Sequence, residues 1–205
     1  MKRSCIIILC VTVGLLLSVQ SLAKTMTARQ VLDKTASVIS NKSGVMANFT
    51  ISNTKMGKST GVIYVKGNKW HAKVPAGLVW YNGKTQWTYV KANEEVNVTT
   101  PTKEQQSAFN PYSFIYLYKK GYKCTLNEKG NTYIVSMIGE NSQKGIGEMI
   151  VIISKSTFAP TKLKMRQGET WTDIIINSFK KGNYADSMFQ FNSKDFPKAE
   201  IIDLR

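Results

Sequence analysis

The feature that most constrains the fold is a hydrophobic pattern with a period of two, which begins near residue 45 and continues through most of the chain. In 69–74, for example, Trp70 and two further apolar residues take one face of an expected strand. Lys69, His71 and Lys73 take the other face, because successive side chains of a strand point to opposite sides. We therefore expect His71 to face solvent.

Turn-forming residues separate these segments. The clearest turn is Asn82-Gly83, between the aromatic strands that carry Trp80, Trp87 and Tyr89. This dipeptide is typical of a two-residue type I′ hairpin turn. Short strands in direct succession predict an antiparallel meander, not βαβ units. About 11–12 strands with few helices favour a mainly β fold, a barrel or a strongly curved sheet.

Two helical regions interrupt the strands. Residues 26–40 have an amphipathic pattern, with Thr27 and Gln30 in capping-box spacing. Residues 102–118 predict two short helices with a bend at Pro111, which disfavours helix at the residue before it. The second of these helices is apolar nearly all round, so it is either buried or covers an apolar hollow.

The first residues are typical of an export signal. Lys2-Arg3 precedes an apolar run over 5–19, and Ser21-Leu22-Ala23 ends it with small residues. We expect cleavage after Ala23 and one domain over 24–205; an uncleaved anchor is the alternative, although the run is short for a membrane span. Cleavage leaves Cys124 as the single cysteine, which we expect to be a small buried residue rather than a reactive thiol.

The composition offers little for catalysis. One histidine and one cysteine in the mature chain do not supply a zinc site or a Cys-His or Ser-His-Asp system. Asp173 is a candidate lone base, but an exposed or hydrogen-bonded carboxylate is far commoner. We predict a protein that is not an enzyme, with no cofactor and no metal.

The net charge of +15 allows attraction to anionic membranes or nucleic acid. Export argues against nucleic acid, and the basic residues are scattered singly rather than gathered in a block. The simpler interpretation of these basic residues is that they form the solvated surface of a monomer.

Several strands carry large apolar residues on both faces, as Ile150 and Ile152 do opposite Met149 and Val151. An ordinary core with helices packed on one face explains this pattern, and so does a barrel interior that is partly unfilled. The apolar helix favours a covered cavity. The residues expected to line it are Phe49, Trp70, Trp80, Trp87, Tyr89, Phe114, Ile115, Leu117, Tyr118, Ile150 and Ile152.

Taken in order, several segments resemble the periplasmic outer-membrane lipoprotein carrier proteins, the LolA-like family. The hairpin 79–89 is similar to the family's "DGKTLWxY", with Asn82 in place of Asp, and Asn110-Pro111 resembles its "NP" helix start. The other matching segments are 45–49, 61–66, and the "FxF…P…viDlR" ending formed by 189–191, Pro197 and 201–205.

The resemblance implies an incomplete antiparallel β-barrel, with helices as a lid over a hydrophobic cavity that receives lipoprotein acyl chains. It also implies an inner-membrane ABC transporter and an outer-membrane acceptor as partners. Family members often carry an arginine that binds the lid just after the "VK" of the second strand, where this chain has Gly67 between Lys66 and Asn68. The alternatives are a periplasmic lipid- or lipoprotein-sensing protein on the same fold and an exported enzyme or adhesin.

Overall fold

The computed structural model describes residues 25–55, 57–102, 117–119, 121–140 and 145–205. These residues form one α-helix, twelve strands and two short 3-10 helices. In chain order they are α1 (Ala28–Ile39), β1 (Val45–Asn53), β2 (Gly57–Lys66), β3 (Lys69–Val74), β4 (Gly77–Tyr81), β5 (Gln86–Val90), β6 (Glu95–Thr99), β7 (Tyr122–Lys129), β8 (Thr132–Gly139), β9 (Glu148–Ser154), β10 (Pro160–Gln167), β11 (Thr170–Lys181), η1 (Asp186–Phe189), η2 (Ser193–Asp195) and β12 (Glu200–Asp203).

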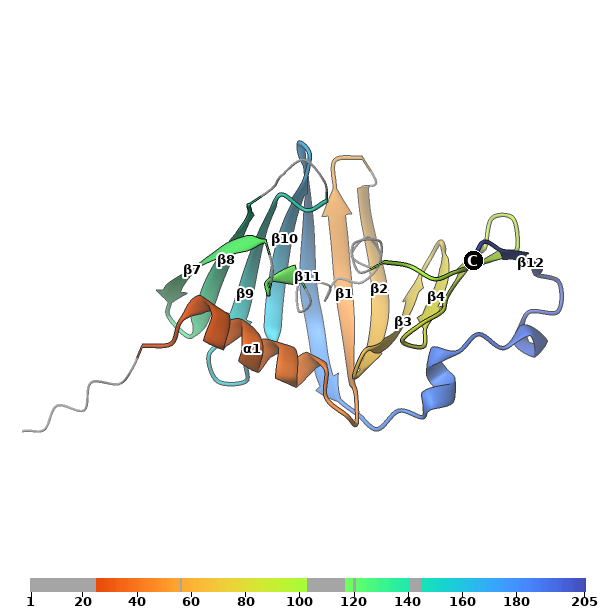
Figure 1. The fold of residues 1–205 in the computed structure, drawn as a ribbon, viewed down its shortest axis with the longest axis horizontal. Coiled ribbons are helices and arrows are strands. Elements are labelled where there is room, and N and C mark those ends of the chain that lie inside the picture. The colour runs from red at the N-terminus through yellow and green to blue at the C-terminus, as the bar shows by residue number, and fades with distance from the viewer. Residues whose placement is uncertain (1–24, 56, 103–116, 120, 141–144) are drawn as a thin grey trace, which may run out of the picture.

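All twelve strands belong to one sheet, in the order β12-β6-β5-β4-β3-β2-β1-β11-β10-β9-β8-β7. Every pairing is antiparallel except that of β12 with β6, which is parallel. The end strands β7 and β12 are not neighbours in this order, so the described sheet is curved but not closed (Figure 1). The expected incomplete barrel of about 11–12 strands is confirmed.

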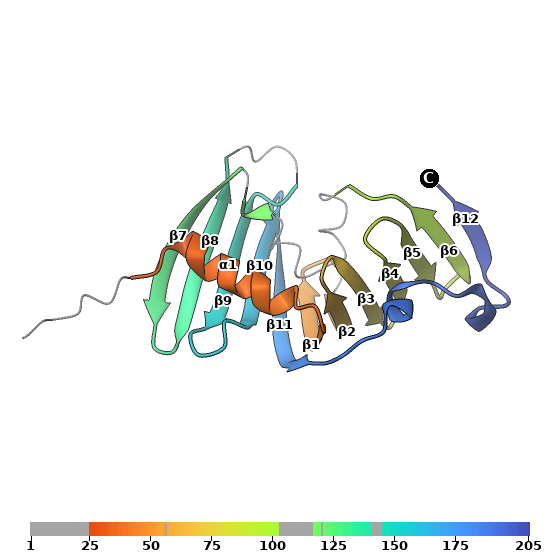
Figure 2. The ribbon, with the colours of Figure 1, turned by 60° about the horizontal axis from the view of Figure 1, so that its bottom comes forward.

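Helix α1 begins with the expected capping box. The Thr27 hydroxyl accepts from the Gln30 backbone N–H, and the Gln30 side chain accepts from the Thr27 N–H. Its buried residues include Val31, Leu32 and Ile39, which join the main hydrophobic core. Figure 2 shows α1 lying across the half of the sheet that β7–β11 form. We call the sheet face that packs into this core the inner face, and the opposite one the outer face.

The C-terminal segment 182–199 covers part of the outer face, over the strands β2–β5 (Figure 2). Phe191 and Phe196 pack on Trp80 with ring centroids 5.5 Å away, and Phe196 also contacts Tyr89 at 4.8 Å. Phe189, in η1, is fully buried. The alternating apolar residues of 188–191 predict a strand, but this prediction is wrong: Asp186–Phe189 is a 3-10 helix, and the aromatic side chains pack on the finished sheet rather than extend it.

His71 is also buried by this arrangement, with 3% of its surface exposed, so the expectation that it faces solvent is wrong. Its ring stacks on Trp80 at 5.0 Å, and its Nδ1 lies 2.9 Å from the Val79 carbonyl oxygen. A carbonyl oxygen only accepts, so Nδ1 donates. The pKa of His71 is lowered from 6.5 to about 4, chiefly by burial and also by the charge of Lys73, while the hydrogen bond to the Val79 carbonyl oxygen acts in the opposite direction.

The hairpin around Asn82 differs from the expected type I′ turn. Tyr81 pairs with Gln86, so four residues connect the strands, and Gly83 has a positive φ while Asn82 does not. The Asn82 carboxamide oxygen accepts from the N–H groups of Lys84 and Thr85. Asparagine here stabilises a longer loop through its side chain rather than through a left-handed backbone.

The inner face depends on a close contact at Gly61. Phe49 on β1 pairs with Gly61 on β2, and its ring lies over the glycine. A Cβ atom at position 61 would be 2.6 Å from Phe49 Cζ and 2.8 Å from the Lys73 carbonyl oxygen. The lack of a side chain at this position is therefore a packing requirement.

Gly61→Ala should lower the free energy of unfolding by about 1–3 kcal/mol, because the Phe49 ring and the β3 backbone must both shift. Urea unfolding measures this change. Gly139→Ala is the matched control, since a Cβ atom there would be at least 3.4 Å from its neighbours. Equal losses in both variants would contradict the packing argument.

Stability should depend on pH between about 4 and 6.5 because of His71. The unfolded imidazole keeps a pKa near 6.5 and the folded one is about 4, so the unfolded state binds the extra proton in this window. The free energy of unfolding should be at its full value above pH 6.5 and fall by about 3 kcal/mol as the pH drops through the window. Urea titrations across this range test it, and His71→Gln should flatten the profile. An equally steep profile in that variant would rule out His71 as the cause.

Candidate functional site

The inner face is a continuous apolar surface that runs across both halves of the sheet. Its rows follow the strand register: Val45 pairs with Val65, Val65 with Trp70, and Trp70 with Tyr81. The buried strand residues that form it are Val45, Ala47, Phe49, Ile63, Val65, Trp70, Ala72, Val79, Tyr81, Val135, Met137, Met149, Val151, Ile153, Leu163 and Ile174. Each methylene that such a surface removes from water contributes about 0.8 kcal/mol, so burial of this face is favourable and its chemistry is that of a hydrocarbon.

Two polar atoms lie within this apolar surface, in the same cross-strand row. Trp70 Nε1 and Gln86 Oε1 are buried and have no hydrogen-bond partner among the described residues. Trp70 pairs with Tyr81, which pairs with Gln86, so the indole and the carboxamide belong to one row. An unpaired buried donor or acceptor costs about 1–3 kcal/mol.

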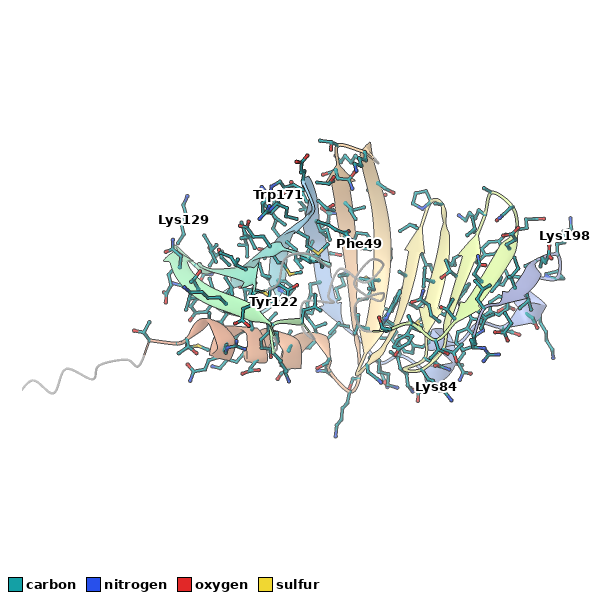
Figure 3. All side chains as sticks on the ribbon, turned by 45° about the horizontal axis from the view of Figure 1, so that its top comes forward. Phe49, Lys84, Tyr122, Lys129, Trp171 and Lys198 are labelled. Atoms are coloured by element: carbon teal, nitrogen blue, oxygen red, sulfur yellow. The ribbon has the colours of Figure 1, made fainter. Side chains whose placement is uncertain are left out.

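Helix α1 is joined to the segment after residue 116 by a set of contacts that we call the Tyr118 clamp: Arg29, Asp33 and Tyr118. The Tyr118 hydroxyl donates to Asp33 Oδ1. Arg29 Nη1 donates to the Tyr118 carbonyl oxygen at 2.7 Å, and Arg29 Nη2 to that of Tyr122 at 3.1 Å. Figure 3 shows Tyr122 beside α1. Burial, together with Asp33, raises the pKa of Tyr118, which stays a hydrogen-bond donor at all physiological pH values.

The two lysines near Gly67 bind the C-terminal segment. Lys66 Nζ and Lys69 Nζ lie 2.9 and 2.7 Å from the carboxylate oxygens of Asp186, and Lys66 also donates to the Tyr184 carbonyl oxygen. These hydrogen bonds lower the pKa of Asp186 to about 2. The lysines therefore tie the C-terminal segment to the outer face, while Arg29 and Asp33 join α1 to Tyr118 and Tyr122.

Four of the eleven predicted site residues come together on the inner side. Phe49, Trp70 and Tyr118 belong to the main core, and Leu117 packs against it. Phe114 and Ile115 lie outside the described residues, as does most of the expected second helix.

The other five predicted residues are on the outer face. Trp80 pairs with Trp87 and Leu78 with Tyr89, and this set packs against the C-terminal segment. Ile150 and Ile152 alternate with the buried Met149 and are half-buried on the uncovered side of β9. They therefore do not share a wall with Phe49 and Trp70.

Sequence reasoning did not select Val151, Leu163, Val79 or Tyr81. In β9 both faces are apolar, so its own pattern does not say which residues point inward. The signal lies in β10, where Leu163 stands between two lysines and pairs with Val151. That pairing, once known, identifies the inner face of β9.

An open hollow of about 500 Å³ lies where β2 and β3 diverge. Half of its lining residues are polar, and Phe49 closes one side of it. The lining consists of Asn48, Phe49, Thr60, Gly61, Val62, Lys73, Val74, Pro75, Lys91 and Asn177. Its mixed chemistry distinguishes it from the apolar inner face.

No group of three or more His, Cys, Asp or Glu side chains among the described residues could hold a metal ion. Cys124 is half-buried against the core, and burial raises the pKa of its thiol. Within the same part of the chain, no helix has the length and apolar character that crossing a membrane requires.

Tyr118→Phe should loosen α1, because the variant loses the hydrogen bond to the Asp33 carboxylate. We expect the free energy of unfolding to fall by about 2 kcal/mol and the α1 amides to exchange faster with deuterium. Tyr133→Phe is the control: within the described part of the chain, its hydroxyl donates to the Met26 sulfur at 3.8 Å, which is a weak acceptor. If α1 exchange is unchanged in Tyr118→Phe, the clamp does not hold the helix.

Comparison with known proteins places this geometry in a family. The chain is similar to solved structures, including an uncharacterized conserved protein from Thermus thermophilus, with 12% identity, a TM-score of 0.61, and 86% of this chain and 98% of that one covered. Two structures are more distant. A LolA superfamily protein from Nitrosomonas europaea has 12% identity and a TM-score of 0.45, with 82% of this chain and 99% of that one covered. MucB in its complex with MucA from Pseudomonas aeruginosa has 10% identity and a TM-score of 0.46, with 82% of this chain and 62% of that one covered.

At such identities, the Thermus structure shows a shared fold only. The sequence has no significant match among curated proteins. The family model described as outer membrane lipoprotein carrier protein LolA matches residues 19–169, well over half of the 205 residues. The chain therefore belongs to the LolA outer membrane lipoprotein carrier family.

Proposed function

We propose that this protein is a soluble periplasmic carrier that binds the acyl chains of lipoproteins on its inner face. The observation that carries the proposal is the continuous apolar inner face of a sheet that does not close on itself. Membership of the lipoprotein carrier family supports the same ligand class.

The physical requirement for such a carrier is a large hydrocarbon-like surface. Acyl chains leave a membrane only if the carrier replaces their lipid neighbours, at about 0.8 kcal/mol for each methylene. The inner face has aliphatic, methionine and aromatic side chains, among them Met137 and Met149. Methionine adapts to ligands of different shape, which suits cargo whose chains vary.

Loading and release require that the cover of the inner face moves. In this proposal α1 is part of the cover, and the Tyr118 clamp holds it while the carrier is closed. Polar contacts of this kind can be exchanged for water at modest cost, whereas the apolar contacts can be exchanged for acyl chains. The clamp thereby takes the place of an arginine at position 67.

The proposed route follows from this chemistry. The chain is exported after cleavage behind Ala23, receives acylated proteins from an inner-membrane ABC transporter, and passes them to an acceptor at the outer membrane. Binding and transfer require no bond to be made or broken, so the protein is a carrier and not an enzyme.

The neighbouring residues Ile175 and Ile176 on β11 provide a direct test, because they point to opposite faces. A chain beginning at Lys24 is titrated with a fluorescent fatty-acid probe. Ile176→Asn, on the inner side and packed against the core, should weaken binding about tenfold. Ile175→Asn, on the outer face, should leave the affinity unchanged.

Equal affinities in both variants, or no binding by the unsubstituted chain, would contradict an inner-face acyl site. Isolation of the protein from its native envelope, followed by mass spectrometry, then identifies the cargo. Acylated protein is the expected ligand. Recovery of free lipid alone would favour a lipid-binding role over lipoprotein transport.

A further inference from the structure

The basic residues, scattered in the sequence, gather on one face of the sheet. Strands β1–β11 contain eleven lysines and arginines, and the strand registers place all but Lys181 on the outer face. The acidic residues on the same face of these strands are Glu148 and Asp173. The ten basic residues are Lys58, Lys66, Lys69, Lys73, Lys123, Lys129, Lys162, Lys164, Arg166 and Lys180.

Among the described residues, no helix or segment is seen to pack on the outer face over β7–β11, where large apolar side chains lie among these cations. Ile138 and Ile175 are 52% and 45% exposed. Three further isoleucines and Trp171 are half-buried there. We define the outer patch as Ile134, Ile138, Ile150, Ile152, Trp171 and Ile175, together with the basic residues Lys123, Lys162, Lys164 and Arg166.

The strand register shows that this patch is contiguous. Ile134 pairs with Ile152, Ile152 with Lys162, and Lys162 with Ile175. In a second row, Lys123 pairs with Ile138 on the neighbouring strand. Apolar and basic side chains are therefore neighbours across the strands within one surface.

Trp171 lies at the basic edge of the patch. Lys164 Nζ is 5.2 Å and Arg166 Cζ 5.8 Å from its ring centroid. Figure 3 shows Trp171 at the end of the strands that is far from α1. Arg166 also pairs with Glu148 and Lys162 with Asp173, so Lys123 and Lys164 are the patch cations without a carboxylate partner among the described residues.

We propose that the outer patch is a docking surface for an anionic lipid bilayer. The chemistry of the patch matches that of an anionic membrane surface. Its isoleucines can enter the headgroup region, the lysines and arginine beside them face the anionic headgroups, and the tryptophan lies at the edge. Each basic residue near such a surface adds attraction, and the excess of cations on the whole outer face orients the molecule as it approaches.

The same charges disfavour a second copy of the chain as the occupant. Two outer faces would bring their excess lysines together, and like charges at close range oppose association. The inner face remains free when the outer patch is docked, because the two faces lie on opposite sides of one sheet. Docking is therefore independent of whether the inner face carries an acyl chain.

The test is sedimentation with vesicles of phosphatidylglycerol mixed with phosphatidylcholine, and with phosphatidylcholine alone. The chain begins at Lys24, because the apolar run over 5–19 would itself bind lipid; all described elements lie within 25–205. It should bind the anionic vesicles, less so at high salt, and not the neutral ones. The variant Lys164→Glu, Ile138→Ser, Ile175→Ser should bind at least about tenfold more weakly.

The matched control is Lys181→Glu, Ile201→Ser, Leu204→Ser. It makes the same change in net charge and removes two exposed aliphatic residues outside the patch. The control should bind as the unsubstituted chain does, with thermal unfolding confirming that both variants fold.

Three results would overturn the proposal. The first is no binding of the unsubstituted chain to anionic vesicles, which would favour an acidic protein as the occupant. The second is an equal loss in both variants, which would mean that net charge alone drives adsorption. The third is a dimer in solution that only the patch variant dissociates, which would assign the patch to a second copy.

Discussion

The pairing of β1 with β11 is the contact on which the rest of the structure depends. It joins residues such as Asn48 and Ser178, which are 130 positions apart and whose side chains are hydrogen-bonded. On one side of this pair lie β2–β6 and β12, and on the other β7–β10. Closing so long a loop is entropically costly, and the local hairpin pairings on either side of the pair shorten the loop that has to be closed.

This pairing also determines which residues share a face. A bulge between Asn48 and Phe49 shifts the register, so that Phe49 stands opposite Ile176 and both point to the inner side. Because the side-chain period is two, a slip of one residue would exchange the faces of the whole of one half relative to the other. The apolar inner face and the basic outer face exist together only in the observed register.

The two halves of the sheet are covered on opposite sides. Helix α1 covers the inner face over β7–β11, and the C-terminal segment covers the outer face over β2–β5. The second cover explains why His71 is buried although its strand alternates clearly with solvent-exposed lysine. It also leaves the outer face of β7–β11 open, where the outer patch lies. The proposed acyl cargo and the proposed membrane contact use different faces of the sheet, the inner face for the cargo and the outer patch for the membrane.

The sequence by itself determined most of the elements. Strand number, the α1 capping box and the family resemblance all follow from local pattern, because alternation, caps and turn residues act over a few positions. The sheet face that a residue occupies was harder to predict. In the sequence, Ile150 and Ile152 are equivalent to Met149 and Val151, and Trp80 was assigned to the cavity without knowledge of its cross-strand partners. Only the tertiary structure decided which face each residue occupies, because that face depends on the cross-strand register. Whether a residue meets water can depend on a segment more than a hundred residues away, as the packing of Phe196 on Trp80 shows.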